Sequence, residues 1–332
     1  MFNPDDRSRF SNFTILTTPY KTVRGHQITT NILIPSHLTN KPSSLPTEAG
    51  SPLRPVLLRI HGGGLVGGSS LFPDFFAPWH LELAARHSAL IVSPNYRLLP
   101  ESSVEEILSD VEDLWTWVQK DMPAFVKAQT NGAVRVDTSR IITAGDSAGG
   151  YLSLMLGLSH PDEIRAVAAA YPMVDAKSRH FMESYEKPMF GLPQLPRSLI
   201  DDHLVRLRNG EIPAILSSDD KGERAELMFA YVQHGAFKVH FPHERREFFP
   251  LDRLEDGARF PRGGVYLWHG KGDTVVPVEG SVKLKEKVTE LDPSLKFWLA
   301  LEEGDHGFDA QSKIDDVWMA EGLKDLVKVW LV

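Results

Sequence analysis

Short apolar runs alternate with amphipathic segments along most of the chain. Four apolar runs end at glycine, proline or polar residues, as strands buried on both faces do, and they cover residues 56–60, 89–92, 141–144 and 167–171. Residues 103–120 instead space their apolar side chains three and four apart. That spacing predicts a helix, with Ser102 or Ser103 as its N-cap.

The same alternation returns near the end of the chain. Strands are predicted at 264–268 and 296–301, and helices at 278–291 and from about 313. Near the start, 13–20 and 27–34 are rich in Thr and Ile, which predicts an antiparallel pair of strands. Residues 35–55 contain five prolines and predict a linker without regular structure.

Buried strands that alternate with helices predict an α/β protein. Such a chain forms a mostly parallel sheet with helices on both faces. Between residues 175 and 263 the alternation stops, and aromatic residues mix with prolines and charges. We therefore expect one catalytic domain made of residues 1–174 and 264–332, with a cap, or lid, inserted at 175–263.

Composition and charge exclude several classes of protein. The chain has 332 residues, of which 42% are hydrophobic, so it can bury a sizeable core. Its net charge of −8 argues against a nucleic-acid-binding protein. The absence of cysteine excludes a disulfide scaffold, a thiolate metal site and a cysteine nucleophile. No secretory signal and no apolar run of about 18 residues is present, so we expect a cytoplasmic protein without a membrane span.

Ser147 lies in the sequence GDSAG at 145–149, between a predicted strand and a predicted helix. This is the G-x-S-x-G turn in the context that exposes a nucleophilic serine. The pattern alone would also fit a glycine-rich turn with a capping serine.

A serine nucleophile needs a base and an acid that orients the base. Asp273 and His306 follow two consecutive predicted strands, in the chain order serine, acid, histidine. Either residue alone could be an ordinary turn residue, but the three together at strand ends predict a catalytic triad. Asp175 follows an earlier strand and stays open as the acid, whereas Asp305 is rejected because it adjoins His306.

The sequence His61-Gly62-Gly63-Gly64 follows another buried strand. Glycines there can turn their N–H groups toward a developing oxyanion, because no Cβ is in the way. The N–H of Ala148, the residue after the nucleophile, would add a donor.

These motifs together resemble the hormone-sensitive lipase-like carboxylesterase group of α/β-hydrolases. The resemblance runs from about residue 55 to 310 and rests on HGGG at 61–64, NYRLLPE at 95–101, GDSAGG at 145–150, YPMVD at 171–175, HGKGDTVVP at 269–277 and GDHGF at 304–308. It implies the α/β-hydrolase fold with a helical cap insertion, and a triad of Ser147, Asp273 and His306. It also implies an oxyanion hole from the N–H groups of Gly63, Gly64 and Ala148, on a loop supported by His61 and Gly62.

Three positions depart from the pattern of that group. Asn95 stands where Asp is usual, Tyr151 where a small or amide residue is common, and Leu65 where an aromatic residue is usual. The amino-terminal cap helices of the group are expected to be missing, since strand-like sequence begins near Phe13. Fungal members, some of which serve secondary metabolism, are the most similar.

The predicted function is that of a serine carboxylesterase. Its substrate would be a small-to-medium apolar or aromatic ester, with no metal, cofactor, nucleic acid or membrane as a partner, and a homodimer stays open. Amide hydrolysis, or lactone closure or cyclisation in secondary metabolism, would use the same triad. A non-catalytic ligand receptor on the same fold is the alternative from another class, and the intact set of Ser147, Asp273 and His306 argues against it.

Overall fold

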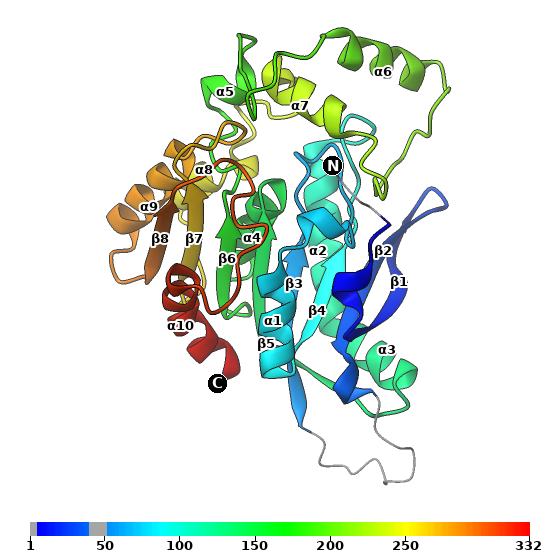
Figure 1. Ribbon diagram of the computed structural model, residues 1–332, viewed down its shortest axis with the longest axis vertical. Helices are drawn as coiled ribbons and strands as arrows, with labels where there is room; N and C mark the ends of the chain where they lie inside the picture. The colour runs from blue at the N-terminus through cyan, green and yellow to red at the C-terminus, as the bar shows by residue number, and fades with distance from the viewer. Residues whose placement is uncertain (1–4, 40–51) are drawn as a thin grey trace.

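The computed structural model describes residues 5–39 and 52–332, whose named strands form one eight-stranded sheet (Figure 1). The strand order is β1-β2-β4-β3-β5-β6-β7-β8. The predicted antiparallel pair at the edge is confirmed as β1 (Phe13–Val23) and β2 (His26–Pro35), and β2 also pairs antiparallel with β4 (Leu90–Pro94). From β4 to β8 in this order, all neighbouring strands pair in parallel. The strands that follow β4 are β3 (Leu53–Ile60), β5 (Arg135–Asp146), β6 (Ala166–Ala170), β7 (Val265–Gly270) and β8 (Phe297–Glu302).

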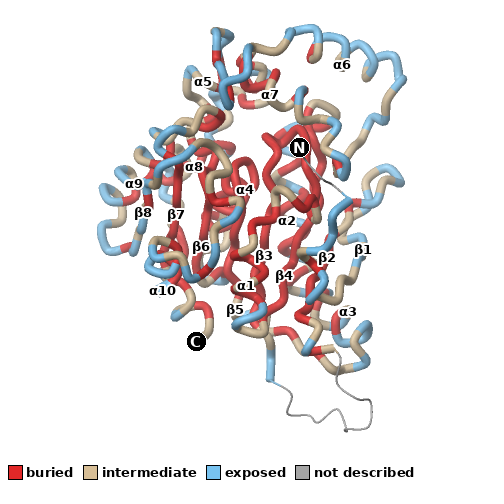
Figure 2. Tube along the Cα trace, viewed as in Figure 1, coloured by how far each residue is buried: buried red, intermediate tan, exposed pale blue. Residues whose placement is uncertain are grey.

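Helices cover both faces of this sheet. Along β3, Leu57 packs on one face while Val56 and Leu58 pack on the other, as the period-two geometry of a strand requires. The Leu57 face is covered by α1 (Pro78–His87) and α10 (Val317–Leu331). The opposite face is covered by α2 (Val104–Lys120), α3 (Met122–Gln129), α4 (Ala148–Ser159) and α9 (Glu279–Leu291). Figure 2 shows the strands as the buried centre of the molecule, which confirms the predicted α/β class.

The linker expected at 35–55 is shorter than predicted. Pro35 still belongs to β2, and a 3-10 helix, η2 (Ser36–Leu38), follows it directly. Leu53 and Arg54 already belong to β3, because they pair with the early residues of a β5 that is longer than predicted. Residues 40–51 of the expected linker lie outside the described residues.

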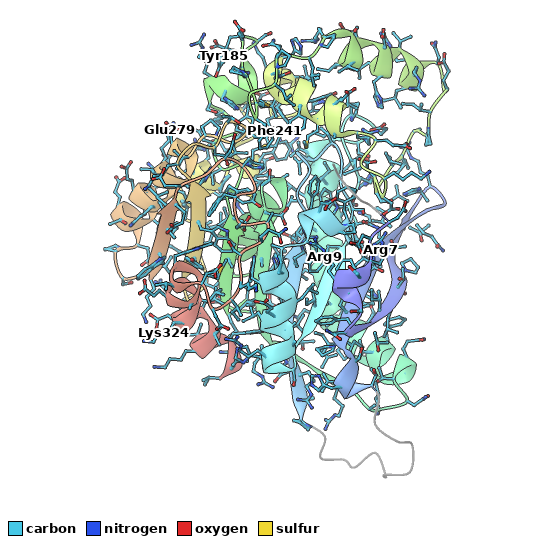
Figure 3. The ribbon with its side chains drawn as sticks, in the orientation of Figure 1. Arg7, Arg9, Tyr185, Phe241, Glu279 and Lys324 are labelled. Atoms are coloured by element: carbon cyan, nitrogen blue, oxygen red, sulfur yellow. The ribbon has the colours of Figure 1, made fainter. Side chains whose placement is uncertain are left out.

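The segment that precedes β1 packs against the molecule through two arginines. Among the described residues before β1, the only helical element is the 3-10 helix η1 (Ser8–Phe10). Arg7 donates to the carbonyl of Leu71 at 2.6 Å, and Arg9 donates to that of Phe76 at 2.5 Å. Both arginines are labelled in Figure 3.

The 175–263 segment joins β6 to β7 and contributes no described residue to the sheet. It contains α5 (Arg179–Met182), α6 (Ser198–Arg208), α7 (Ala225–Gln233) and α8 (Pro250–Glu255), with 3-10 helices η4 (Ala236–Val239) and η5 (Arg246–Phe248). Helices α5, α6 and α7 lie beyond one end of the sheet (Figure 1). Met228 of α7 shares a pocket with Ser147 and His306, so this is the end at which the parallel strands terminate.

Aromatic rings form much of the interior of the 175–263 segment. Phe237 lies at the centre, with its ring 5.8 Å from those of Phe181 and Tyr231 and 6.2 Å from that of Phe241. Phe241, labelled in Figure 3, is fully buried, and its ring lies 5.9 Å from that of Tyr151 of α4. Many of the aromatic residues of this segment therefore pack in its own core or against helix α4.

Candidate active site

Ser147 lies in a sharp turn between β5 and α4. Its φ of 55° and ψ of −118° are unfavourable for a residue with a Cβ, so the surrounding fold must enforce them. A Cβ at Gly145 would lie 2.2 Å from the carbonyl oxygen of Gly149, and one at Gly149 would lie 2.1 Å from that of Ile60. These two glycines thus allow β5, α4 and β3 to approach closely enough to present Ser147.

Asp146 connects this turn to the glycine-rich loop. One carboxylate oxygen accepts the N–H of Gly62 at 3.0 Å, and the other forms an ion pair with Arg59 at 2.9 Å. Arg59 is fully buried, and its guanidinium lies 4.5 Å from the ring centre of Phe76. Burial raises the pKa of Asp146, and the charge of Arg59 opposes that rise.

The structure brings Asp273 and His306 into direct contact. The Nδ1 atom of His306 lies 2.8 Å from Oδ2 of Asp273. The other oxygen of Asp273 accepts the N–H groups of Val275 and Val276 at 2.9 and 2.8 Å. Burial alone would raise the pKa of Asp273, but the charge of His306 and hydrogen bonds from His269 and His306 lower it well below its ordinary value. Asp273 is therefore ionised at neutral pH.

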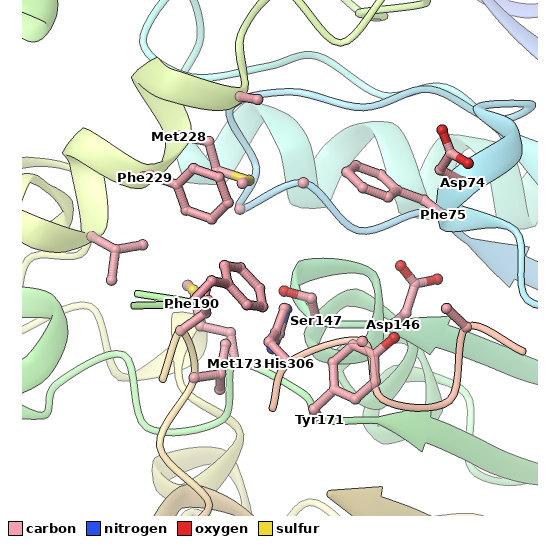
Figure 4. Close-up of a pocket in the computed structure, with 18 of the residues that line it drawn as sticks. Asp74, Phe75, Asp146, Ser147, Tyr171, Met173, Phe190, Met228, Phe229 and His306 are labelled. Atoms are coloured by element: carbon pink, nitrogen blue, oxygen red, sulfur yellow. The ribbon is translucent and has the colours of Figure 1, made fainter. Parts of the chain in front are cut away.

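Ser147 and His306 line the same pocket, and Figure 4 draws the serine hydroxyl beside the imidazole ring. The ring of Tyr171 meets that of His306 edge-on, with 4.5 Å between ring centres. Ser147, His306 and Asp273 come from the ends of three parallel strands, which explains why residues so distant in the chain meet here.

The two other candidate acids are engaged elsewhere. Asp175 forms an ion pair with Lys283 of α9, at 2.6 Å. Asp305 accepts the main-chain N–H and the hydroxyl of Thr274 at 2.7 and 2.8 Å, and also the main-chain N–H of His306. Of the three aspartates considered from the sequence, Asp273 is the one whose carboxylate meets the imidazole of His306.

Two glycines of the glycine-rich loop lie at the wall of the pocket. Gly63 and Gly64 line the pocket and have φ values of 108° and 62°, which favour glycine. Within the described residues their N–H groups donate no hydrogen bond to the protein. Ala148 is the first residue of α4, so its N–H has no acceptor one turn earlier in the helix.

His61 is buried next to this loop. Its ring is fully buried and stacks on that of Tyr96, with 4.3 Å between ring centres. Its Nδ1 atom lies 2.7 Å from the carbonyl oxygen of Gly62. Burial lowers the pKa of His61 to about 3, so the ring is neutral at physiological pH.

The pocket has a volume of about 220 Å³ and mostly apolar walls (Figure 4). Its polar groups come from outside the 175–263 segment and include Ser147, His306, Asp146 and Asp309. Its apolar lining comes both from the 175–263 segment and from the rest of the described chain. It comprises Phe75, Ala77, Met173, Phe181, Phe190, Ala225, Met228, Phe229, Val232, Phe237, Val275, Val276 and Ala310.

Sequence reasoning missed a buried acid beside the predicted triad. Asp309 is 1% exposed and accepts the hydroxyl of Tyr171 at 2.9 Å and the indole N–H of Trp268 at 2.7 Å. Burial raises the pKa of Asp309 to about 6. The sequence features that point to Asp309 are weak: it lies three residues after His306, and its partner Tyr171 directly follows a strand.

The three departures from the family pattern have local structural partners. Asn95 accepts the N–H of Ser70 at 2.8 Å and donates to the hydroxyl of Thr29 at 3.1 Å. Tyr151 donates to the carbonyl of Phe248 at 2.8 Å and so connects α4 to the 175–263 segment. Leu65 is fully buried, and its carbonyl accepts the N–H of Leu99 at 2.8 Å.

Within residues 5–39 and 52–332, no three or more His, Asp or Glu side chains are grouped so that they could hold a metal ion. In the same ranges, every helix is too short or too polar to cross a membrane.

Comparison with known proteins defines the class of the chain. The family model of the alpha/beta hydrolase fold matches residues 57–204. A probable carboxylesterase of Cochliobolus lunatus is 37% identical over 199 residues, which cover 57% of this chain and 86% of that protein. A probable carboxylesterase of a Phoma species is 26% identical over 332 residues, which cover 97% and 98% of the two chains.

Two further matches are to a polyketide synthase and to a solved esterase structure. A non-reducing polyketide synthase of Stereocaulon alpinum is 32% identical over 144 residues, which cover 43% of this chain and 5% of the synthase. A solved fungal esterase from Rhizomucor miehei has a TM-score of 0.59 and 19% identity, and the match covers 98% of this chain and 86% of that one.

A mostly parallel sheet with a strained serine turn and a carboxylate–histidine pair at its strand ends defines a class of hydrolytic enzymes. The chain belongs to the α/β-hydrolase fold family and is carboxylesterase-like. The predicted resemblance and fold are thereby confirmed.

Proposed function

We propose that the chain is a serine carboxylesterase that acts through an acyl-enzyme on Ser147. One observation carries the proposal: His306, paired with the ionised Asp273 at 2.8 Å, lies in one pocket with Ser147 and the glycine-rich loop. The names of the relatives from Phoma and Cochliobolus agree with this activity.

In the first half of the reaction, Ser147 attacks the ester carbonyl. His306 takes the proton of the serine hydroxyl through Nε2, while Asp273 stabilises the imidazolium through Nδ1. The carbonyl oxygen becomes an oxyanion that accepts hydrogen bonds from the N–H groups of Gly63, Gly64 and Ala148. The C–O bond to the alcohol then breaks, and the leaving alkoxide takes the proton from His306.

In the second half, water attacks the acyl group bound to Ser147. His306 accepts a proton from this water, a second tetrahedral intermediate forms at the same N–H groups, and the acid leaves as Ser147 recovers its proton. Besides the substrate and water, these steps use side chains and main-chain N–H groups of this chain.

The walls of the pocket suggest the class of substrate. Phenylalanine and methionine side chains from the 175–263 segment face Ser147 across the pocket (Figure 4). Such walls favour apolar or aromatic groups by burying them from water. We propose a small-to-medium apolar or aromatic ester, with residues 1–174 and 264–332 as the catalytic domain and residues 175–263 as its cap.

A second candidate is favoured by the match to the polyketide synthase. The acyl-enzyme on Ser147 could transfer its acyl group to a hydroxyl of the substrate itself, which would close a lactone instead of releasing an acid. The chemistry up to the acyl-enzyme is the same, so the two candidates differ only in the second nucleophile.

The test is hydrolysis of p-nitrophenyl acetate and p-nitrophenyl butyrate by the wild type and by Ser147→Ala. We expect wild-type turnover and a loss of about 10⁴-fold or more in kcat for the variant, because the nucleophile is removed. Ser294→Ala is the matched control, since Ser294 is an exposed serine in the turn before β8 and lies outside the pocket.

Labelling with a fluorophosphonate probe separates an enzyme from a receptor. A single labelled serine that disappears in Ser147→Ala supports the proposal. Turnover that persists in Ser147→Ala, or a wild-type protein that neither hydrolyses an ester nor takes the label, contradicts it.

A further inference from the structure

Phe190 occupies the tip of a tight turn in an unfavourable backbone conformation. Met189 and Leu192 form an isolated antiparallel bridge, with the N–H of Leu192 donating to the carbonyl of Met189 at 2.9 Å. The two residues between them, Phe190 and Gly191, have φ values of 53° and 72°. Such a turn suits glycine or asparagine at both positions, so a phenylalanine at the first one is strained.

Phe190 is partly exposed to solvent and also lines the pocket of the nucleophile. Phe190 is 44% exposed, yet it lines the pocket that contains Ser147 and His306. Its ring packs edge-on against that of Phe229 of α7, with 5.9 Å between ring centres. Figure 4 shows the ring directed toward Ser147 and His306.

A hydrogen bond fixes the turn to the loop that carries the triad acid. The N–H of Phe190 donates to the hydroxyl of Thr274 at 3.0 Å. Thr274 directly follows Asp273, and its hydroxyl donates to Asp305 at 2.8 Å. The position of the ring is therefore set from two sides, by Phe229 and by Thr274.

Leu192 differs from Phe190 in one respect that makes it a useful control. It lies in the same turn and is also an exposed apolar residue, at 58% exposure. It does not line the pocket, so its removal should affect the turn without changing the pocket wall.

We propose that Phe190 is a specificity-determining residue of the site. Its ring closes the outer side of the pocket and limits the size of the group that an ester can place beside Ser147. This inference rests on the proposed function and deepens it: the favoured esters carry a slim acyl group beside Phe190, and rigid, bulky acyl groups such as benzoyl are discriminated against. An aromatic group of the substrate would then lie on the alcohol side of the ester.

Size selection by an apolar wall has a measurable range. In such pockets one methylene group changes kcat/KM by roughly 10-fold to 200-fold, and selectivity is the ratio of two kcat/KM values. The ratio is insensitive to changes that slow all substrates equally, so it isolates the effect of the pocket wall.

The main experiment compares p-nitrophenyl acetate with p-nitrophenyl benzoate. In Phe190→Ala and Phe190→Gly we expect the benzoate-to-acetate ratio of kcat/KM to rise by about 10-fold, because both variants open the outer side of the pocket. Phe190→Leu should restore part of the discrimination. Leu192→Ala should leave the ratio within about twofold of the wild type, and an equal rise there would overturn the proposal.

The pair of Ala and Gly variants separates the ring from the turn. Glycine relieves the positive φ, so Phe190→Gly should have a higher melting temperature than Phe190→Ala. Both lack the ring, so their selectivity should be the same. A change in ratio that appeared in the alanine variant alone would mean that turn distortion is its cause, and it would overturn the proposal.

The anchoring hydroxyl gives a second, independent readout. Thr274→Val removes the acceptor for the N–H of Phe190, whereas Thr274→Ser retains it. We expect the ratio to rise in the valine variant and to stay near the wild-type value in the serine variant. The same ratio in both would show that the anchor does not position the ring.

Binding measurements keep the inference testable without turnover. In the Ser147→Ala background, Phe190→Ala should tighten the binding of p-nitrophenyl benzoate relative to the acetate by about 10-fold. If the wild type hydrolyses no ester, the proposed function fails, but these binding constants still test Phe190. If the wild type is an active esterase and neither the kinetic nor the binding ratio changes, the inference alone fails.

Discussion

Asp273 and Asp175 allow a direct test of which carboxylate serves His306. Asp273→Asn would keep the shape of the side chain but remove the charge that stabilises the imidazolium, so kcat should fall by about 10⁴-fold. Asp175→Asn removes a carboxylate that pairs with Lys283, and its kcat should stay within about twofold of the wild type. Steady-state kinetics with p-nitrophenyl acetate would measure both. A large loss in Asp175→Asn with little loss in Asp273→Asn would contradict the assignment.

Single substitutions can measure how much the hydrogen bond between Tyr171 and Asp309 contributes to the free energy of unfolding. Tyr171→Phe keeps the ring against His306 but leaves one buried oxygen of Asp309 without a donor, which should cost about 1–3 kcal/mol of unfolding free energy. Asp309→Asn alone should also destabilise the protein. Because the two residues share one hydrogen bond, the double variant should lose less than the sum of the single losses. Urea unfolding of the four proteins gives the coupling, and strict additivity would show that the bond contributes nothing.

The residues of the candidate site were predictable to different degrees, for a physical reason. Ser147, Asp273 and His306 each follow a strand, so the order of elements predicts that they meet at one edge of the sheet. Asp309 becomes notable only when its partners Tyr171 and Trp268 are close, and the Tyr171 contact spans 138 positions of the chain. No local sequence pattern predicts such a contact, because the contact depends on how distant loops pack.

At the scale of elements, Lys187 connects two helices of the 175–263 segment through hydrogen bonds. Its buried ammonium donates to the carbonyls of His180 and Glu183 at 2.6 Å each, at the end of α5, and to that of Val232 in α7 at 2.8 Å. Burial, together with the charge of Arg179, lowers the pKa of Lys187 to about 8. The interaction is the familiar one of a cation at the carboxyl ends of helices, here removed from solvent.

Lys187→Met should therefore loosen α5 and α7 while the sheet stays intact. Three carbonyls would lose their donor, at a cost of about 1–3 kcal/mol for a buried group left unpaired. Hydrogen exchange should become faster in α5 and α7 than in the wild type, with little change in β5 and β6. Lys238→Met is the matched control, because Lys238 is an exposed lysine of the same segment. Equal exchange rates in the two variants would contradict the role of Lys187.

Elements with strong local signals were predictable, and those held by tertiary contacts were not. The helix expected at 103–120 is α2, and the structure selects Ser103 as its cap, with Glu106 completing a capping box. By contrast, α5 and α8 have four and six residues, too few for an apolar periodicity to be recognised. Phe181 of α5 is buried by a contact with Phe237, which is distant in the chain.

At the scale of the whole molecule, buried histidines make the stability depend on pH. Burial lowers the pKa of His61 to about 3 and that of His240 to about 4, whereas unfolded histidine titrates near pH 6.5. At these two histidines the unfolded chain therefore binds more protons than the folded one below pH 6.5, and this lowers the free energy of unfolding as the pH falls from 6.5 toward 4. Asp309 acts in the opposite sense: its raised pKa of about 6 makes its charge costly above pH 6, and that cost fades as the pH falls toward 4.

The buried histidines and Asp309 change the free energy of unfolding by different amounts between pH 7 and pH 5. At about 1.4 kcal/mol per pH unit, His61 and His240 each subtract roughly 2 kcal/mol between pH 7 and pH 5, and Asp309 restores roughly 1 kcal/mol. Burial also lowers the pKa of His80 well below its ordinary value, so His80 adds to the decrease, and the free energy of unfolding should be lower at pH 5 than at pH 7. Urea unfolding at the two pH values measures it. His240→Phe should reduce the decrease by roughly 2 kcal/mol, and Asp309→Asn should enlarge it by roughly 1 kcal/mol, because each variant removes one titrating group. A wild-type free energy of unfolding that is equal at pH 7 and pH 5, or a His240→Phe variant with an unchanged pH dependence, would show that these buried groups do not control the acid sensitivity of the fold.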